Sequence, residues 1–217
     1  MDPSDYEAWY GSPRGQWISN AEHVLLADML APVSGETLLD VGCGTGHFSR
    51  VFAGLNGLQV TGIDIDPVWL DYARTRPGAS IDYVRASALD IPFSDKTFDL
   101  SVSVTALCFM APQRQALAEM LRVTRRRFAL GLLNQHSLLY WQKGRHGGSG
   151  AYRGAHWHTV GEIKRLFSGL PVTDLSIRSC VFLPEGNWVS RIVEKTLPTT
   201  LPLGGFLAVS GKISQEM

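Results

Sequence analysis

The run from Leu38 to Ser49, LLDVGCGTGHFS, combines a buried-strand pattern with three closely spaced glycines. The strand pattern contains Asp40 near its end, and the chain then turns into a stretch with helical spacing. The turn contains Gly42, Gly44 and Gly46. Glycines at such a turn supply unusual backbone angles and let a ligand approach the main chain closely. This pattern predicts the binding of a ligand that contains a nucleoside.

An acidic residue follows at the end of the next apolar run, where Asp64 stands in the sequence GIDID. A carboxylate at this place can accept hydrogen bonds from both hydroxyls of a ribose. The alternative role, capping the following helix, fits Asp66 better, because Pro67 suits the first turn of a helix. A nicotinamide-binding turn would have its third glycine one position later, where His47 stands. The spacing therefore favours a different nucleoside ligand.

Apolar runs alternate with helical patterns from residue 37 onward, which is typical of a parallel sheet covered by helices. The expected strands are 37–41, 58–63, 81–85, 98–104, 127–133, 172–182 and 206–211. The expected helices are 19–30, 47–53, 67–76, 113–123 and 159–167, with a partly irregular segment between the last two strands. No polar linker separates two cores, so the sequence predicts a doubly wound α/β fold in one domain, residues 1–217.

Four segments resemble the class I S-adenosylmethionine-dependent methyltransferases, specifically small bacterial ones related to the ubiquinone/menaquinone methyltransferases. The segments are LLDVGCGTG, GIDID, IPFSDKTFDLSVS and ALAEMLRVTRR, and they span residues from about 37 to 133. The resemblance implies a Rossmann-like sheet of seven strands, mostly parallel, with an antiparallel last strand. It also implies S-adenosylmethionine as the cofactor. It assigns to the methionine end of the cofactor the residues Asp40, Gly42, Gly44 and Gly46. It assigns Asp64 to the ribose and Ile65 to the adenine.

Two positions depart from the family pattern. The family's Asp-Ala pair, whose acid binds the adenine amino group, aligns with Ser87 and Ala88. We assign both residues to the adenine site, where the Ser87 hydroxyl keeps a hydrogen bond but loses the charge. The family's Pro-Gly-Gly turn is replaced by Thr124 to Arg127. We expect the three arginines there to form a solvated turn and not a phosphate site.

Methyl transfer from a sulfonium depends mainly on positioning and desolvation, so no catalytic triad is expected. The acceptor should lie between the N-terminal segment, about residues 1–35, and the loop that follows the fifth strand. The N-terminal segment is too interrupted by glycine and proline to be a simple helix, and its aromatic residues are Tyr6, Trp9, Tyr10 and Trp17. Two interpretations carry equal weight: a lid over the cofactor, or ordinary anchors on the sheet edge.

The loop of about residues 134–159 is rich in glycine, aromatic, histidine and basic residues, and it contains no acid. This local charge favours an anionic or polar acceptor. The candidate catalytic residues are His146, Tyr152, His156 and His158. A histidine could accept the proton of a hydroxyl acceptor, and Tyr152 could supply an apolar wall. The alternatives are a surface loop with solvated histidines and, less favoured, a metal site of three histidines without a carboxylate or cysteine.

Charge and composition narrow the function further. The chain has 20 Lys and Arg against 20 Asp and Glu, which argues against a nucleic-acid surface. No apolar run is long enough for a membrane span and the N-terminus lacks the basic-then-apolar layout of a signal peptide, so a cytoplasmic location is expected. Three cysteines far apart exclude a disulfide framework. The expected function is methylation of a small molecule; the alternatives are a protein or tRNA methyltransferase and an inactive cofactor-binding interaction protein.

Overall fold

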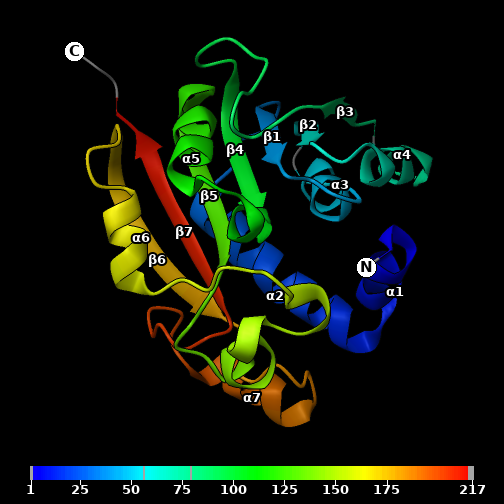
Figure 1. The fold of residues 1–217 in the computed structure, drawn as a ribbon, viewed down its shortest axis with the longest axis vertical. Coiled ribbons are helices and arrows are strands. Elements are labelled where there is room, and N and C mark those ends of the chain that lie inside the picture. The colour runs from blue at the N-terminus through cyan, green and yellow to red at the C-terminus, as the bar shows by residue number, and fades with distance from the viewer. Residues whose placement is uncertain (1, 56, 79, 215–217) are drawn as a thin grey trace.

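A single seven-stranded sheet with helices on both faces forms the body of the molecule (Figure 1). The computed structural model describes residues 2–55, 57–78 and 80–214. The strands in chain order are β1 (Thr37–Val41), β2 (Gln59–Asp64), β3 (Asp82–Arg85), β4 (Phe98–Val104), β5 (Thr124–Leu133), β6 (Val172–Cys180) and β7 (Phe206–Ile213). The spatial order is β3-β2-β1-β4-β5-β7-β6, and β7 is antiparallel to both of its neighbours. The predicted Rossmann-like sheet with an antiparallel last strand is confirmed.

The helices cover the sheet in two layers. Their bounds are α1 (Pro3–Gly11), α2 (Pro13–Leu30), α3 (His47–Ala53), α4 (Pro67–Thr75), α5 (Gln113–Arg122), α6 (Val160–Leu166) and α7 (Trp188–Thr196), with short turns η1 (Ala106–Phe109), η2 (Tyr140–Gly144), η3 (Arg145–Gly147) and η4 (Gly150–Tyr152). Helices α2 and α3 pack on one face, and α5 and α6 pack on the other. Within the described ranges, no helix is both long and apolar enough to cross a membrane.

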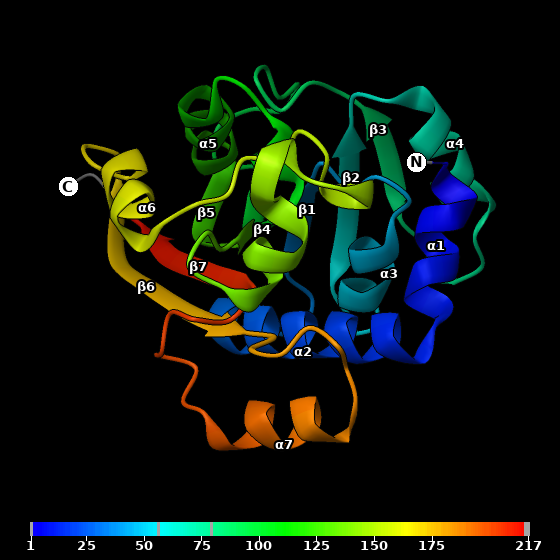
Figure 2. The same cartoon turned by 60° about the horizontal axis from the view of Figure 1, so that its bottom comes forward.

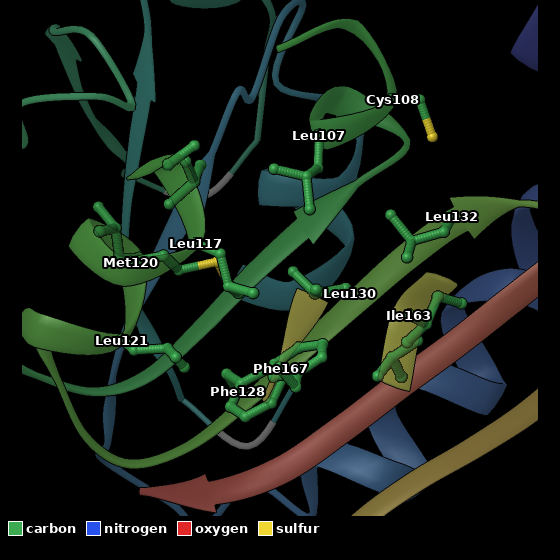
Figure 3. Close-up of a cluster of buried hydrophobic side chains, with 14 of the residues drawn as sticks. Leu107, Cys108, Leu117, Met120, Leu121, Phe128, Leu130, Leu132, Ile163 and Phe167 are labelled. Carbon is green, nitrogen blue, oxygen red and sulfur yellow. The ribbon is translucent and has the colours of Figure 1, made fainter. Parts of the chain in front are cut away.

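Alternation along the strands divides the core between these two faces. Phe128, Leu130 and Leu132 of β5 point toward α5 and α6, where they meet side chains such as Leu117 and Phe167 (Figure 3). The rings of Phe128 and Phe167 stack with their centroids 5.3 Å apart. Burial of each such side chain contributes about 1.5–3 kcal/mol. This packing fixes β4 and β5, whose carboxyl ends border the site described below.

The N-terminal segment forms two helices, α1 and α2, which are separated by the extended backbone of Ser12, so the prediction that it is no simple helix is confirmed. Pro3 and Pro13 each occupy the first turn of a helix, where no backbone donor is needed. The side chains of Asp2 and Ser12 cap the two helices. The second helix starts six residues before the expected Ser19, which is instead buried within it.

The arginine-rich stretch after α5 forms the start of β5, so the prediction of a solvated turn was wrong. Thr124 is fully buried and its hydroxyl donates to the carbonyl of Met120. The guanidinium of Arg125 pairs with Asp99, and that of Arg126 pairs with Glu36. These partners lie far away in sequence, and they hold the arginines along the strand. Helix α7 lies within the segment that was expected to be partly irregular and packs outside α2 (Figure 2).

Candidate functional site

The glycine turn after β1 requires backbone angles that L side chains rarely adopt. Gly42, Gly44 and Gly46 have φ values of +76°, +54° and +73°. Both Gly42 and Cys43 donate their backbone N–H to the carbonyl of Ile63 on β2, at 2.8 and 2.9 Å. A Cβ on Gly42 would lie 2.4 Å from the Cβ of Ala106. Only glycine therefore fits at Gly42, where the turn packs closely against Ala106.

Asp64 links the end of β2 to this turn. One carboxylate oxygen accepts the N–H of Gly44 at 2.8 Å, and the other accepts the N–H of Asp66 at 3.0 Å. Each oxygen keeps capacity for a further donor, as a pair of ribose hydroxyls would need. Asp66 caps α4 by accepting the N–H of Val68, as predicted.

A cavity of about 520 Å³ lies above these carboxyl ends, and we call it the cofactor pocket. The predicted cofactor residues in its lining are Asp40, Gly42, Gly44, Asp64, Ile65, Ser87 and Ala88. Gly46 stands apart from this lining and faces Tyr83, whose hydroxyl would lie 2.1 Å from an added Cβ. The side chain of Ile65 is 65% exposed and free to lie against a flat ring. The hydroxyl of Ser87 accepts the N–H of Leu89 at 3.1 Å.

Asp40 is a buried acid at the floor of the cofactor pocket. It is 2% exposed, and one of its oxygens accepts the hydroxyl of Ser49 at 2.6 Å. Burial raises the pKa of Asp40 to about 7, although the bond from Ser49 opposes that rise. A cationic ligand group in the pocket would favour the ionised carboxylate.

Helix α1 lies beside α3 and α4 (Figure 2), is fastened to the glycine turn and contributes Tyr6 to the lining of the cofactor pocket. The carboxylate of Glu7 accepts the hydroxyl of Thr45 at 2.6 Å and pairs with Arg50 at 2.8 Å. Both charged side chains are largely buried, so the pair is shielded from screening by solvent. The ring of Tyr6 reaches the pocket and packs edge-on against Trp69. These contacts give α1 the placement of a lid.

A second cavity, of about 270 Å³, adjoins the cofactor pocket, and we call it the second chamber. The two cavities share lining residues, which are Tyr6, Thr105, Phe109 and Ala151. The second chamber lies between α1, α2 and the loop of residues 134–159, and its lining includes Trp9, Tyr10 and Tyr152. Trp17, in contrast, lines a groove between α2 and α7. Tyr6, Trp9 and Tyr10 thus border the cavities, whereas Trp17 packs between helices.

Sequence reasoning missed one residue of the second chamber, Glu22 on α2. Its side chain is 9% exposed and lines the chamber. Burial raises the pKa of Glu22 to about 8. The sequence carried a signal, because Glu22 shares the inner face of α2 with Ile18, Leu25 and Leu26, all of which are apolar. A carboxyl among such neighbours is a candidate functional group.

The histidines of the loop do not converge on these cavities. His156 and His158 line a separate depression with Gln113 and Glu162, on the α6 side of the loop. His158 is buried, with Nε2 3.1 Å from the Oε1 of Gln113, and burial lowers its pKa to about 4. His146 is exposed and, among the described residues, lies outside the lining of both cavities. The structure thus brings Tyr152 to the second chamber and places the three histidines elsewhere. Within the described ranges, no cluster of three or more metal-ligating side chains is found.

Comparisons with known proteins agree with this geometry. Residues 39–128 match the family described as "Methyltransferase domain". An O-methyltransferase of Penicillium expansum is 39% identical over 101 residues, covering 44% of this chain and 37% of that protein. The malonyl-[acyl-carrier protein] O-methyltransferase of Serratia marcescens is 41% identical over 91 residues, covering 42% and 35%. The chain thus matches only about two fifths of the length of these curated relatives or less. The family match leaves out residues 1–35 and 134–159.

The structure is similar to that of an S-adenosylmethionine-dependent methyltransferase of Thermotoga maritima, which is described as a possible histamine N-methyltransferase. The TM-score is 0.77 at 19% identity, and the match covers 97% of this chain and 96% of that one. Residues 39–128 of the chain match the methyltransferase domain family, and the chain as a whole has the fold of an S-adenosylmethionine-dependent methyltransferase.

Proposed function

We propose that the chain transfers the methyl group of S-adenosylmethionine to a small-molecule acceptor held in the second chamber, in the cytoplasm. The observation that carries this proposal is the shared wall of the two cavities, through which a ligand in one can meet a ligand in the other. The small volume of the chamber, about 270 Å³, favours a small acceptor over a protein or tRNA. The free cysteines Cys43, Cys108 and Cys180 suit a reducing compartment.

Each part of the cofactor pocket has a role in this proposal. The turn at Gly42 and Gly44 supports the methionine end, Asp64 holds the ribose hydroxyls, and Ile65 lies against the adenine. The fit follows from the pocket's volume and from the glycine turn in its lining. S-adenosylmethionine supplies, when bound, a methyl group on a positively charged sulfur. The lid helix α1 excludes water, which strengthens electrostatic interactions inside the pocket.

Charge at the second chamber supports a polar or anionic acceptor. Arg14 of α2 and Lys143 of η2 both belong to its lining. The guanidinium of Arg14 donates from Nε to the carbonyl of Pro184 at 2.6 Å, which holds the side chain in place. A carboxylate or phosphate on the acceptor would find these cations at the chamber wall. The names of the relatives as O-methyltransferases support an oxygen acceptor.

A transfer assay tests the proposal directly. The protein is incubated with S-adenosylmethionine labelled in its methyl group and with a metabolite extract, and the small-molecule and macromolecular fractions are counted separately. We expect label in small molecules. Label confined to protein or RNA would contradict the proposal, and no transfer at all despite cofactor binding would leave the interaction-protein alternative.

Cofactor affinity is expected to fall as the pH is lowered from 8 to 5.5. The pKa of Asp40 is raised to about 7 in the free protein, so the carboxyl becomes protonated below that value and loses its attraction for the cationic cofactor. The dissociation constant should rise by up to about tenfold per pH unit below 7. Calorimetric titrations across this range measure the effect, and Asp40→Asn should give a flat profile. An equally flat profile in the wild type would contradict the role of Asp40.

Replacing His156 and His158 together with alanine is expected to leave turnover within about threefold of the wild type. Both residues line a depression apart from the two cavities. The melting temperature should drop by several degrees, because His158 is buried and loses its contact with Gln113. Turnover of the variant is measured well below its melting temperature. A loss of about 100-fold in the folded variant would restore a histidine as the base, as the sequence suggested.

A further inference from the structure

The second chamber holds an acid that nothing around it neutralises. Glu22 is the one carboxylate among the described residues of its lining. No described side chain forms an ion pair or hydrogen bond with it, and its raised pKa is caused by burial alone. A buried carboxyl of purely structural use would have donors around it. Apolar residues usually stabilise a core better than a buried ionisable group does, so retention of Glu22 has a cost in stability.

The walls around Glu22 suit a flat ring. Aromatic side chains reach the chamber from α1, η1 and η4, including those of Trp9, Phe109 and Tyr152. The volume of about 270 Å³ is at the small end for a ligand site, which fits a compact molecule. Arg14 and Lys143 lie in the same wall and add positive charge for an acidic substituent.

We propose that Glu22 is the general base of the reaction, and that it accepts the proton of a phenolic hydroxyl on a compact aromatic acceptor, preferably one that also carries a carboxylate. This inference rests on the proposed function and adds the substrate class and the catalytic residue. The carboxylate meets the hydroxyl, while Arg14 and Lys143 meet the acidic substituent. A ring between these groups lies against the aromatic wall.

The step balances without another reactant. The acceptor oxygen forms a bond with the methyl carbon as the carbon–sulfur bond breaks, and the electron pair of that bond passes to the sulfur. The hydroxyl proton passes to the carboxylate of Glu22. The sulfur loses its positive charge and the acid loses its negative charge, so net charge in the closed site is unchanged. The proton leaves to solvent after product release.

Glu22 titrates near neutral pH, whereas the groups that face it do not. The titratable or charged groups around it are Tyr6 and Tyr10 on α1, Arg14 on α2, Lys143 and Tyr152 on the loop, and Cys180 on β6. Burial raises the pKa of Tyr6 and Tyr152 to about 12, and it raises those of Tyr10 and Cys180 as well. These four groups stay neutral in the working range. The fraction of ionised Glu22, and with it turnover, should therefore rise with pH with a midpoint near 8.

The test compares the wild type with Glu22→Gln, which keeps the size of the side chain but cannot accept the proton. Asp28→Asn is the matched control, because Asp28 lies on the same helix but is exposed and pairs with Arg178 at 2.7 Å. Labelled methyl transfer is measured between pH 5.5 and 9 with simple phenols, hydroxybenzoates, alkylamines and thiols. We expect label in phenols, more in hydroxybenzoates, and a rate that rises with pH with a midpoint near 8. Glu22→Gln should be about 100-fold slower with no such rise, at unchanged cofactor affinity.

Thermal unfolding gives a readout that does not depend on activity. The pKa of Glu22 is raised in the folded protein, so ionisation costs stability as the pH rises from about 4.5 toward 8. The melting temperature of Glu22→Gln should therefore exceed that of the wild type by a margin that grows over this range. The difference in melting temperature between Asp28→Asn and the wild type should stay constant over the same pH range.

Several outcomes would overturn the inference. If Glu22→Gln kept the rate and pH profile of the wild type, Glu22 would not be the base. If the difference in melting temperature between Glu22→Gln and the wild type did not change with pH, Glu22 would not be a buried acid with a raised pKa. Transfer to amines or thiols but not to phenols would contradict the substrate class while leaving the proposed function intact. Binding of the cofactor with no transfer to any small molecule would overturn the proposed function itself.

Discussion

Replacing Asp64 with alanine is expected to weaken the binding of S-adenosylmethionine by about 1.5–3 kcal/mol, a roughly 10- to 150-fold rise in Kd. The variant loses charge-assisted hydrogen bonds to both ribose hydroxyls. It also releases the N–H of Gly44, which the carboxylate now holds at 2.8 Å. Calorimetric titration measures the change. An affinity equal to that of the wild type would overturn the assignment of the ribose site.

Two further variants separate ligand binding from folding. Asp82→Ala removes an exposed acid at the start of the neighbouring strand β3 and should leave affinity unchanged. Asp64→Asn keeps one acceptor oxygen and should fall between the wild type and Asp64→Ala. If all three variants lost affinity equally, the effect would belong to charge in general and not to a specific contact.

A methyl group at Gly42 is expected to lower the melting temperature by roughly 5–15 °C. The residue has φ +76°, which costs an L side chain about 1–2 kcal/mol. The new Cβ would also lie 2.4 Å from Ala106 and 2.9 Å from the Cε of Met110. Such overpacking adds about 1–3 kcal/mol, and each kcal/mol shifts the melting temperature by about 2–4 °C in a chain of this size.

Gly35 offers the matched control for this variant. Its φ is +81°, close to that of Gly42, but a Cβ there would meet nothing within 4 Å. Gly35→Ala should therefore show the backbone cost alone and keep full affinity for the cofactor. Gly42→Ala should lose affinity as well, because its turn must shift. Equal melting temperatures and affinities in the two variants would contradict a turn held tightly by Ala106 and Met110.

The fold and the cofactor pocket were largely predictable because their signals are local. Buried strands, glycines at a strand end and an acid after the next strand stand close together in sequence, and parallel strands bring their carboxyl ends to one edge. The strand β1, the turn at Gly42 and the cap at Asp66 are confirmed for this reason. Helix α1 and the first turns of α2 were not predicted, because the place of Pro3 and Pro13 in a first turn depends on the caps that precede them.

The acceptor side was harder to predict because it depends on contacts between distant segments. Nothing near Glu22 in sequence shows that α1 and the loop with Tyr152 close a chamber over it. His156 and His158 lie near Tyr152 in sequence, but the chain turns their side chains toward α5 and α6 instead. Arg125 and Arg126 belong to β5 because Asp99 and Glu36 pair with them from far away. Periodicity and composition carry no information on such pairings.

The central claim is that the cofactor pocket binds S-adenosylmethionine, and a calorimetric titration of the wild-type protein with this cofactor tests it most directly. The same protein is titrated with NAD as a comparison, because a nicotinamide-binding turn would have a glycine at the position of His47. The account predicts saturable binding of S-adenosylmethionine at one molecule per chain and no heat of binding with NAD. Binding of NAD, or no binding of S-adenosylmethionine to the folded protein, would contradict it.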